Sequence, residues 1–80
     1  MIDSPVFAEF VEEGRALGRL EARRSDIVAA LETRFGPVPA AVMEQVAQLT
    51  DVARASVHFR RALVAESLEV FAQELAAANP

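Results

Sequence analysis

Few side chains in this 80-residue sequence are of a type that does chemistry, and the most reactive of them is His58. An imidazole can act as a general base or bind a metal ion, but neither a nucleophile nor a second carboxylate is spaced to work with it. The chain has no cysteine, and one histidine cannot build a metal site within a single chain. We therefore interpret His58 as a half-buried or surface residue with a local hydrogen bond.

The carboxylates of Glu9, Glu12 and Glu13 form the other cluster that could do chemistry. Near the start of a helix, such a cluster is explained by the positive end of the helix dipole, so a general acid and base pair is not needed to account for it. No glycine-rich phosphate loop is present, because Gly14 and Gly18 lie inside a helical pattern. We expect no enzyme activity, no metal site and no cofactor.

All eight basic residues are arginines, and they face twelve acidic residues, for a net charge of −4. Arg15, Arg19 and Arg23 are four residues apart and form a stripe, while Arg60 and Arg61 form a second group. Acidic residues lie close to each group in the sequence, so we interpret both as solvated helix faces with local ion pairs. The net charge also argues against nucleic acid as a partner.

The elements that position these side chains are all helices, so the sequence predicts an all-α fold in a single domain, 1–80. A long helix is expected at 5–35, because Ser4 and Pro5 suit an N-cap and a first helical residue. It ends at Gly36, where two nearby prolines prevent its continuation. Three shorter helices are expected after this break, at about 39–49, 52–64 and 67–77, which together form a lobe of residues 39–78.

Apolar residues at helical spacing predict the buried faces of the short helices: Val42, Val46 and Leu49; then Val52, Ala55, Phe59 and Leu63; then Leu68, Phe71 and Leu75. This core is small, because a chain of this size buries only roughly 60% of its unfolded surface. The long helix is roughly 46 Å in length, whereas a compact chain of this size is about 30 Å across. The helix must therefore extend beyond the lobe.

The long helix also carries a heptad pattern typical of a coiled coil. Its predicted self-association interface consists of Phe7, Phe10, Val11, Gly14, Leu17, Glu21, Arg24, Val28, Leu31 and Phe35. We expect a homo-oligomer, most simply a dimer through the long helix, to complete the helical bundle. The stripe of Gly14, Gly18 and Ala22 either lets another helix approach closely or weakens a linker helix.

An antiparallel pairing of two long helices is favoured by charge. In a parallel pair, Glu21 would face Glu21 and Arg24 would face Arg24, and like charges held that close are unfavourable. The predicted antiparallel register instead places Glu21 opposite Arg24, and it pairs residues 17 with 28, 14 with 31 and 10 with 35. Large apolar residues then meet small or matching ones.

Several segments carry a resemblance to a known family: residues 13–23 (EGRALGRLEAR), 31–39 (LETRFGPVP), 60–63 (RRAL) and 67–69 (SLE). Together they resemble the C-terminal helical region of bacterial recombination-promoting nuclease and transposase-like proteins of the PD-(D/E)XK type. The resemblance implies a nuclease domain in front of such a tail, but the Glu-x-Lys element of that site needs a lysine and this chain has none. We expect a stand-alone or excised tail without cleavage activity.

Three function classes follow from the sequence. The first is a non-catalytic self-association module. The second is a nucleic-acid accessory module, in which segments 39–49 and 52–64 form a helix-turn-helix-like pair. The third is a small regulator that binds a different chain and stays partly unfolded without it. The first residues are acidic and do not resemble a signal peptide, and no apolar run approaches the ~20 residues that span a bilayer, so we expect a cytoplasmic location.

Overall fold

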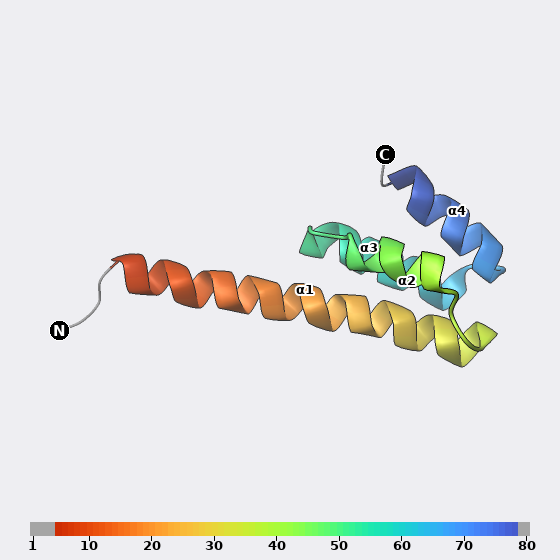
Figure 1. Cartoon of the computed structure of the whole chain (residues 1–80), viewed down its shortest axis with the longest axis horizontal. Helices are drawn as coiled ribbons and strands as arrows, with labels where there is room; N and C mark the ends of the chain where they lie inside the picture. Colours follow the sequence, from red (N-terminus) through yellow and green to blue (C-terminus); the bar gives the residue numbers. More distant parts are fainter. Residues whose placement is uncertain (1–4, 79–80) are drawn as a thin grey trace.

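The computed structural model describes residues 5–78, and it describes side chains from Glu12 onward. The chain forms four α-helices, which are α1 (Pro5–Phe35), α2 (Ala40–Ala47), α3 (Val52–Val64) and α4 (Leu68–Ala78) (Figure 1). The predicted all-α fold, with one long helix followed by three shorter ones, is confirmed. Ser4, the predicted N-cap of the long helix, lies outside the described residues. No described helix combines the length and the apolar character that crossing a membrane requires.

The molecule is elongated because α1 is longer than the lobe that packs on it. Helices α2, α3 and α4 gather over the C-terminal half of α1, and its N-terminal half extends beyond them (Figure 1). The chain measures 53 × 26 × 20 Å and its radius of gyration is 15.2 Å. A compact chain of this length has a radius of gyration near ~12 Å. Part of α1 is therefore left without cover from its own chain.

The break after α1 follows from Gly36, which has a φ of +87°. This left-handed conformation is one that side chains with a Cβ atom disfavour. The amide of Gly36 donates to the carbonyl oxygen of Glu32 at 3.0 Å, which satisfies one of the free carbonyls at the end of the helix. The chain then reverses toward α2, which lies back along α1 (Figure 1).

Two short helices begin with side-chain caps. The carboxylate of Asp51 accepts a hydrogen bond from the amide of Ala53 at 3.1 Å, at the start of α3. The hydroxyl of Ser67 accepts one from the amide of Val70 at 3.1 Å, at the start of α4. Each cap satisfies an amide that has no partner within the helix.

Helix α2 is shorter than predicted and ends at Ala47 instead of residue 49. The amide of Leu49 donates to the carbonyl oxygen of Val46 at 3.1 Å, three residues back, so the chain tightens into a turn. This turn directs the Leu49 side chain into the core, where it is buried. The predicted burial of Val42, Val46 and Leu49 is confirmed.

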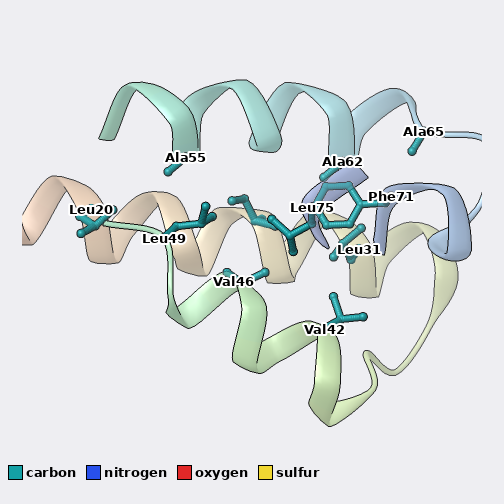
Figure 2. Packing of buried hydrophobic residues seen from close by; sticks show 11 residues of the cluster. Leu20, Leu31, Val42, Val46, Leu49, Ala55, Ala62, Ala65, Phe71 and Leu75 are labelled. Atoms are coloured by element: carbon teal, nitrogen blue, oxygen red, sulfur yellow. The ribbon is translucent and has the colours of Figure 1, made fainter. Parts of the chain in front are cut away.

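One hydrophobic core holds the four helices together (Figure 2). Its buried members are Leu20, Ile27 and Leu31 from α1; Val42 and Val46 from α2; Leu49; Ala55 and Ala62 from α3; Ala65; and Phe71 and Leu75 from α4. Leu68 is only half-buried, at the first position of α4. Among the side chains that the structure describes, the core begins at Leu20 along α1, and residues 12–19 lie outside it.

The buried face of α3 differs from the predicted one. Ala55, His58 and Ala62 are buried, whereas Phe59 is half-buried and Leu63 is exposed. The closest packing partner of α3 is α1, and the distance between two packed helices depends on the size of the side chains between them. The two alanines let α3 lie close to α1, and the larger residues move to the flanks of the contact.

Candidate self-association surface

One apolar face of α1 runs from the core out into solvent. Leu17, Leu20, Ile27 and Leu31 follow helical spacing and share this face. Leu20 is 6% exposed, and Ile27 and Leu31 are 0% exposed, because the lobe covers them. Leu17 is one turn before Leu20 and is 59% exposed. The face therefore continues past the point where the lobe ends.

Residues 12–19 are here called the α1 overhang. They are the part of α1 that lies outside the lobe and whose side chains the structure describes. Every one of them except Ala16 is exposed. The α1 overhang meets the lobe at an open groove of about 330 Å³, lined by Glu13, Ala16, Leu17, Leu20, Thr50 and Val52. Thr50, from the connection between α2 and α3, and Val52, the first residue of α3, form the wall of this groove, here called the edge groove.

The structure separates the predicted interface residues into three groups. Gly14, Leu17 and Glu21 are exposed, and Arg24, Val28 and Phe35 are half-buried. Leu31 is 0% exposed and packs inside its own chain, so it offers no surface to a second copy. The prediction that Leu31 lies in the interface is therefore wrong, because the lobe packs over the C-terminal half of α1 and buries this residue. The side chains of Phe7, Phe10 and Val11 lie outside the described residues.

Arg24 also differs from its predicted role. Its Nε donates to the carbonyl oxygen of Leu49 at 2.9 Å, and its Nη2 donates to the same oxygen. Arg34 acts in the same way, with Nη1 donating to the carbonyl oxygen of Ala62 at 2.9 Å in the last turn of α3. Free carbonyls at helix ends favour a cation, so these two arginines hold the lobe on α1. In this structure the Arg24 guanidinium is turned toward its own chain instead of toward a partner's Glu21.

Three further arginines bind acidic or aromatic groups of their own chain. Arg15 pairs with Glu12 at 3.3 Å. Arg23 pairs with Asp26 and donates to the Ser56 hydroxyl, both at 3.1 Å, and its guanidinium lies 5.4 Å from the ring centre of Phe59. Arg61 forms a bidentate salt bridge with Glu74, in which both hydrogen bonds are 2.9 Å long. This salt bridge holds the pKa of the Glu74 carboxyl below its usual value. Arg15 and Arg23 thus form the expected local ion pairs, whereas Arg61 pairs with Glu74 of α4, and Arg19 and Arg60 form none with residues 12–78.

Two more open grooves flank α1 along the lobe. One is about 310 Å³ and is lined by Arg24, Ser25, Val28, Met43, Val46 and Ala47. The other is about 320 Å³ and is lined by Asp26, Ala29, Ala30, Thr33, Arg34, Phe59 and Leu63. Both walls of each groove come from the same chain, and each runs alongside the packed half of α1. Neither extends along the α1 overhang.

Comparisons with protein-family models, with curated proteins and with solved structures find no match to this chain. We therefore infer its function from the geometry and chemistry of its own surface.

His58 lies in the core and not on a surface that could bind a substrate. It is 7% exposed, its ring meets the edge of Phe71 at 6.4 Å, and its Nδ1 makes no hydrogen bond within the described residues. The predicted half-buried or surface position of His58 is therefore wrong, and the expected local hydrogen bond is not found at Nδ1. Burial lowers the pKa of this imidazole, as does Arg54, while Glu74 acts in the opposite direction. No cluster of metal-ligating side chains occurs in the part of the chain that the structure describes.

The residues that sequence reasoning missed are Thr50 and Val52 of the edge groove. Their types carry no signal for a contact surface, since a threonine before a cap and a valine at a helix start are ordinary. Only the packing of α3 on α1 brings them next to Leu17. The α1 overhang and the edge groove together form the candidate surface.

Proposed function

We propose that this chain is a non-catalytic self-association module whose contact surface is the α1 overhang together with the edge groove. The supporting observation is the exposure of Leu17, 59%, on the same helix face as Leu20, which the lobe covers. An apolar side chain that continues this face beyond the lobe gains free energy when a partner removes it from water. Covering Leu17 fully would contribute on the order of 1.5–3 kcal/mol.

The small core gives a second reason for a partner. Three of its eleven buried hydrophobic residues are alanines, which bury little apolar area, and the side chains of the α1 overhang add nothing to it. A second copy that binds the folded chain stabilises it by mass action, and the effect increases with protein concentration. A self-associating chain is therefore expected to become more stable as its concentration rises.

The test is the mass in solution, measured by light scattering after size exclusion at micromolar concentration. The expected mass is at least twice that of one chain, 8.7 kDa. Leu17→Asp should shift the population to monomer, because it places a charge on the contact face. Val64→Asp is the matched control, since Val64 is also highly exposed, 63%, but lies on α3. A monomeric wild type with full helicity, or equal effects of the two variants, would overturn the proposal.

The nucleic-acid alternative gains no support from the arginines. Arg15, Arg23, Arg24, Arg34 and Arg61 bind groups of their own chain. Only Arg19, Arg54 and Arg60 make no hydrogen bond or ion pair to residues 12–78. A salt-dependent shift with duplex DNA at ~50 mM salt is the result that would favour this alternative.

The resemblance to the tail of recombination-promoting nucleases fits a module without catalytic residues, and we retain it as a proposal about context. In that setting the chain would contribute contacts between copies and no cleavage. A regulator that binds a different chain would give another result in the mass measurement. It would be a monomer that stays partly unfolded until that chain is added. The cytoplasmic location stays a prediction.

A further inference from the structure

The lobe ends at a defined point along α1. Leu20 is buried, and the residues from Glu12 to Arg19 are exposed except for Ala16. Figure 1 shows the N-terminal half of α1 clear of the three shorter helices. From Pro5 to Arg19 the helix spans roughly 22 Å at 1.5 Å per residue. This is the length of the α1 backbone that extends beyond the lobe.

A pairing along the whole of α1 conflicts with the contacts already made in one chain. The sequence-based register places residue 14 opposite Leu31 and Glu21 opposite Arg24. Leu31 is fully buried by the lobe, and the Arg24 guanidinium binds the Leu49 carbonyl. Freeing both would break contacts that hold the lobe on α1. A second copy therefore has to use the part of α1 before Leu20.

The charges along the α1 overhang favour one direction. Its acidic residues, Glu12 and Glu13, come before its basic residues, Arg15 and Arg19. In a parallel pair, like charges would face each other. In an antiparallel pair centred near Gly14, Glu13 of each copy lies opposite Arg15 of the other. The order of charges is thus complementary to itself when one copy is reversed.

Resting on the self-association proposed above, we infer that two copies pair antiparallel through their α1 overhangs, about a two-fold axis near Gly14. The partner's helix lies where the lobe ends and fills the edge groove, between Leu17 of α1 and the wall formed by Thr50 and Val52. The partner thereby covers the α1 overhang, just as the lobe covers α1 from Leu20 onward. Each copy gives and receives the same contact, as a two-fold interface requires.

The size of the contact explains why the wall of the edge groove belongs to it. A stable dimer buries on the order of 800 Å² on each partner. Two short stretches of helix in contact along one face bury less surface area than a full-length coiled coil would. The groove wall adds surface from the lobe, so a change in Thr50 should weaken the pair although Thr50 is not in α1.

Single cysteines on α1 distinguish this register from the others, because the chain has no cysteine of its own. Glu13→Cys and Glu21→Cys are matched, since both replace exposed glutamates of α1. With the axis near Gly14, the two copies of residue 13 are separated along the helix by roughly 3 Å, and those of residue 21 by roughly 21 Å. Under mild oxidation, Glu13→Cys should form a disulfide-linked dimer and Glu21→Cys should not.

Each other outcome overturns the inference in a recognisable way. Cross-linking of Glu21→Cys alone indicates the longer register, and cross-linking of both indicates a parallel pair. A dimeric mass with neither cross-link places the interface elsewhere, and the proposed function then still stands. A monomeric mass for the wild type removes the proposed function itself.

A second pair of variants tests the edge groove without cysteine chemistry. Thr50→Arg introduces a long charged side chain into the groove wall and should raise the dimer dissociation constant about tenfold or more. Thr33→Arg is its control, because Thr33 is also an exposed threonine but lines the groove between α1 and α3. Equal dissociation constants for the two variants would contradict a contact at the edge groove.

Discussion

Arg24 on α1 donates two hydrogen bonds to a single carbonyl oxygen, that of Leu49 in the connection between α2 and α3. Leu49 itself is buried, so its carbonyl has few other partners to choose from. The contact ties the middle of α1 to the point where the chain turns from α2 into α3. A residue that the heptad pattern assigns to an intermolecular seam therefore serves the fold of one chain.

Replacing this arginine should destabilise the lobe. Arg24→Met keeps an apolar stem but removes both hydrogen bonds, and bonds from a charged donor contribute about 1.5–3 kcal/mol. We expect a loss of about that size in the free energy of unfolding, measured in urea at fixed protein concentration. Arg60→Met should change the same quantity by less than about 0.5 kcal/mol, because Arg60 is exposed and makes no hydrogen bond or ion pair to residues 12–78. Similar values for the two variants would show that the Leu49 contact contributes little.

The buried imidazole of His58 predicts a loss of stability in mild acid. Burial lowers its pKa in the folded chain, whereas in the unfolded chain it titrates near 6.5. Below that pH the unfolded state binds the proton more readily, so the free energy of unfolding falls as the pH decreases from about 6.5 toward the folded-state pKa. The steepest slope one group can give is about 1.4 kcal/mol per pH unit.

Glu74 titrates in a lower range, and this separates the two effects. The bond from Arg61 lowers the pKa of Glu74 from its usual 4.5, so its contribution to stability is lost only below that pH. The interval between 6.5 and 4.5 thus reports on His58. In urea titrations across this interval, His58→Leu should show a flatter dependence than the wild type. Equal slopes would mean that His58 is free to ionise in the fold.

Two glycine substitutions should act in opposite directions. Gly36 has a φ of +87°, so Gly36→Ala places a Cβ in the left-handed region at a cost of about 1–2 kcal/mol. A Cβ at Gly18 meets no atom of the chain within 4 Å, and alanine suits a helix better by about 0.5–1 kcal/mol. Urea unfolding should therefore give a lower free energy of unfolding for Gly36→Ala and a higher one for Gly18→Ala than for the wild type. If Gly18→Ala instead lowers the dimer mass, a second helix approaches closely at this glycine.

The start of α4 offers a test of helix capping. Ser67→Ala removes the hydrogen bond to the amide of Val70 and should lower the free energy of unfolding by about 1 kcal/mol. Val70→Glu places a carboxylate at the third position of the helix, where it can accept from the Ser67 amide and add about 0.5 kcal/mol. Thermal unfolding of the two single variants and the double variant measures both effects. A destabilised Val70→Glu would mean that the half-buried valine contributes more through packing.

The sequence by itself determined where the helices begin and where α1 ends. Pro5, Gly36 and Pro39 act through backbone geometry, and Asp51 and Ser67 act through hydrogen bonds to amides a few residues away. Such interactions depend on neighbouring residues only, so they can be recognised without knowing the fold. The excess length of α1 over the lobe follows from the same boundaries, because the rise per residue of a helix is constant.

Only the tertiary structure decided which side of each helix is buried and how far the cover extends. The pattern in α3 favoured Ala55, Phe59 and Leu63. Of these only Ala55 is buried, and packing against the other helices buries His58 and Ala62 in place of the two larger apolar residues. Along α1, the face before Leu20 has the same spacing as the face after it, and no local signal marks the end of the lobe. That point depends on where the chain turns after α2, and the turn is held by a contact between Arg24 and Leu49, which are far apart in the sequence. A periodic pattern records which residues are apolar, whereas their burial depends on distant segments that pack against them.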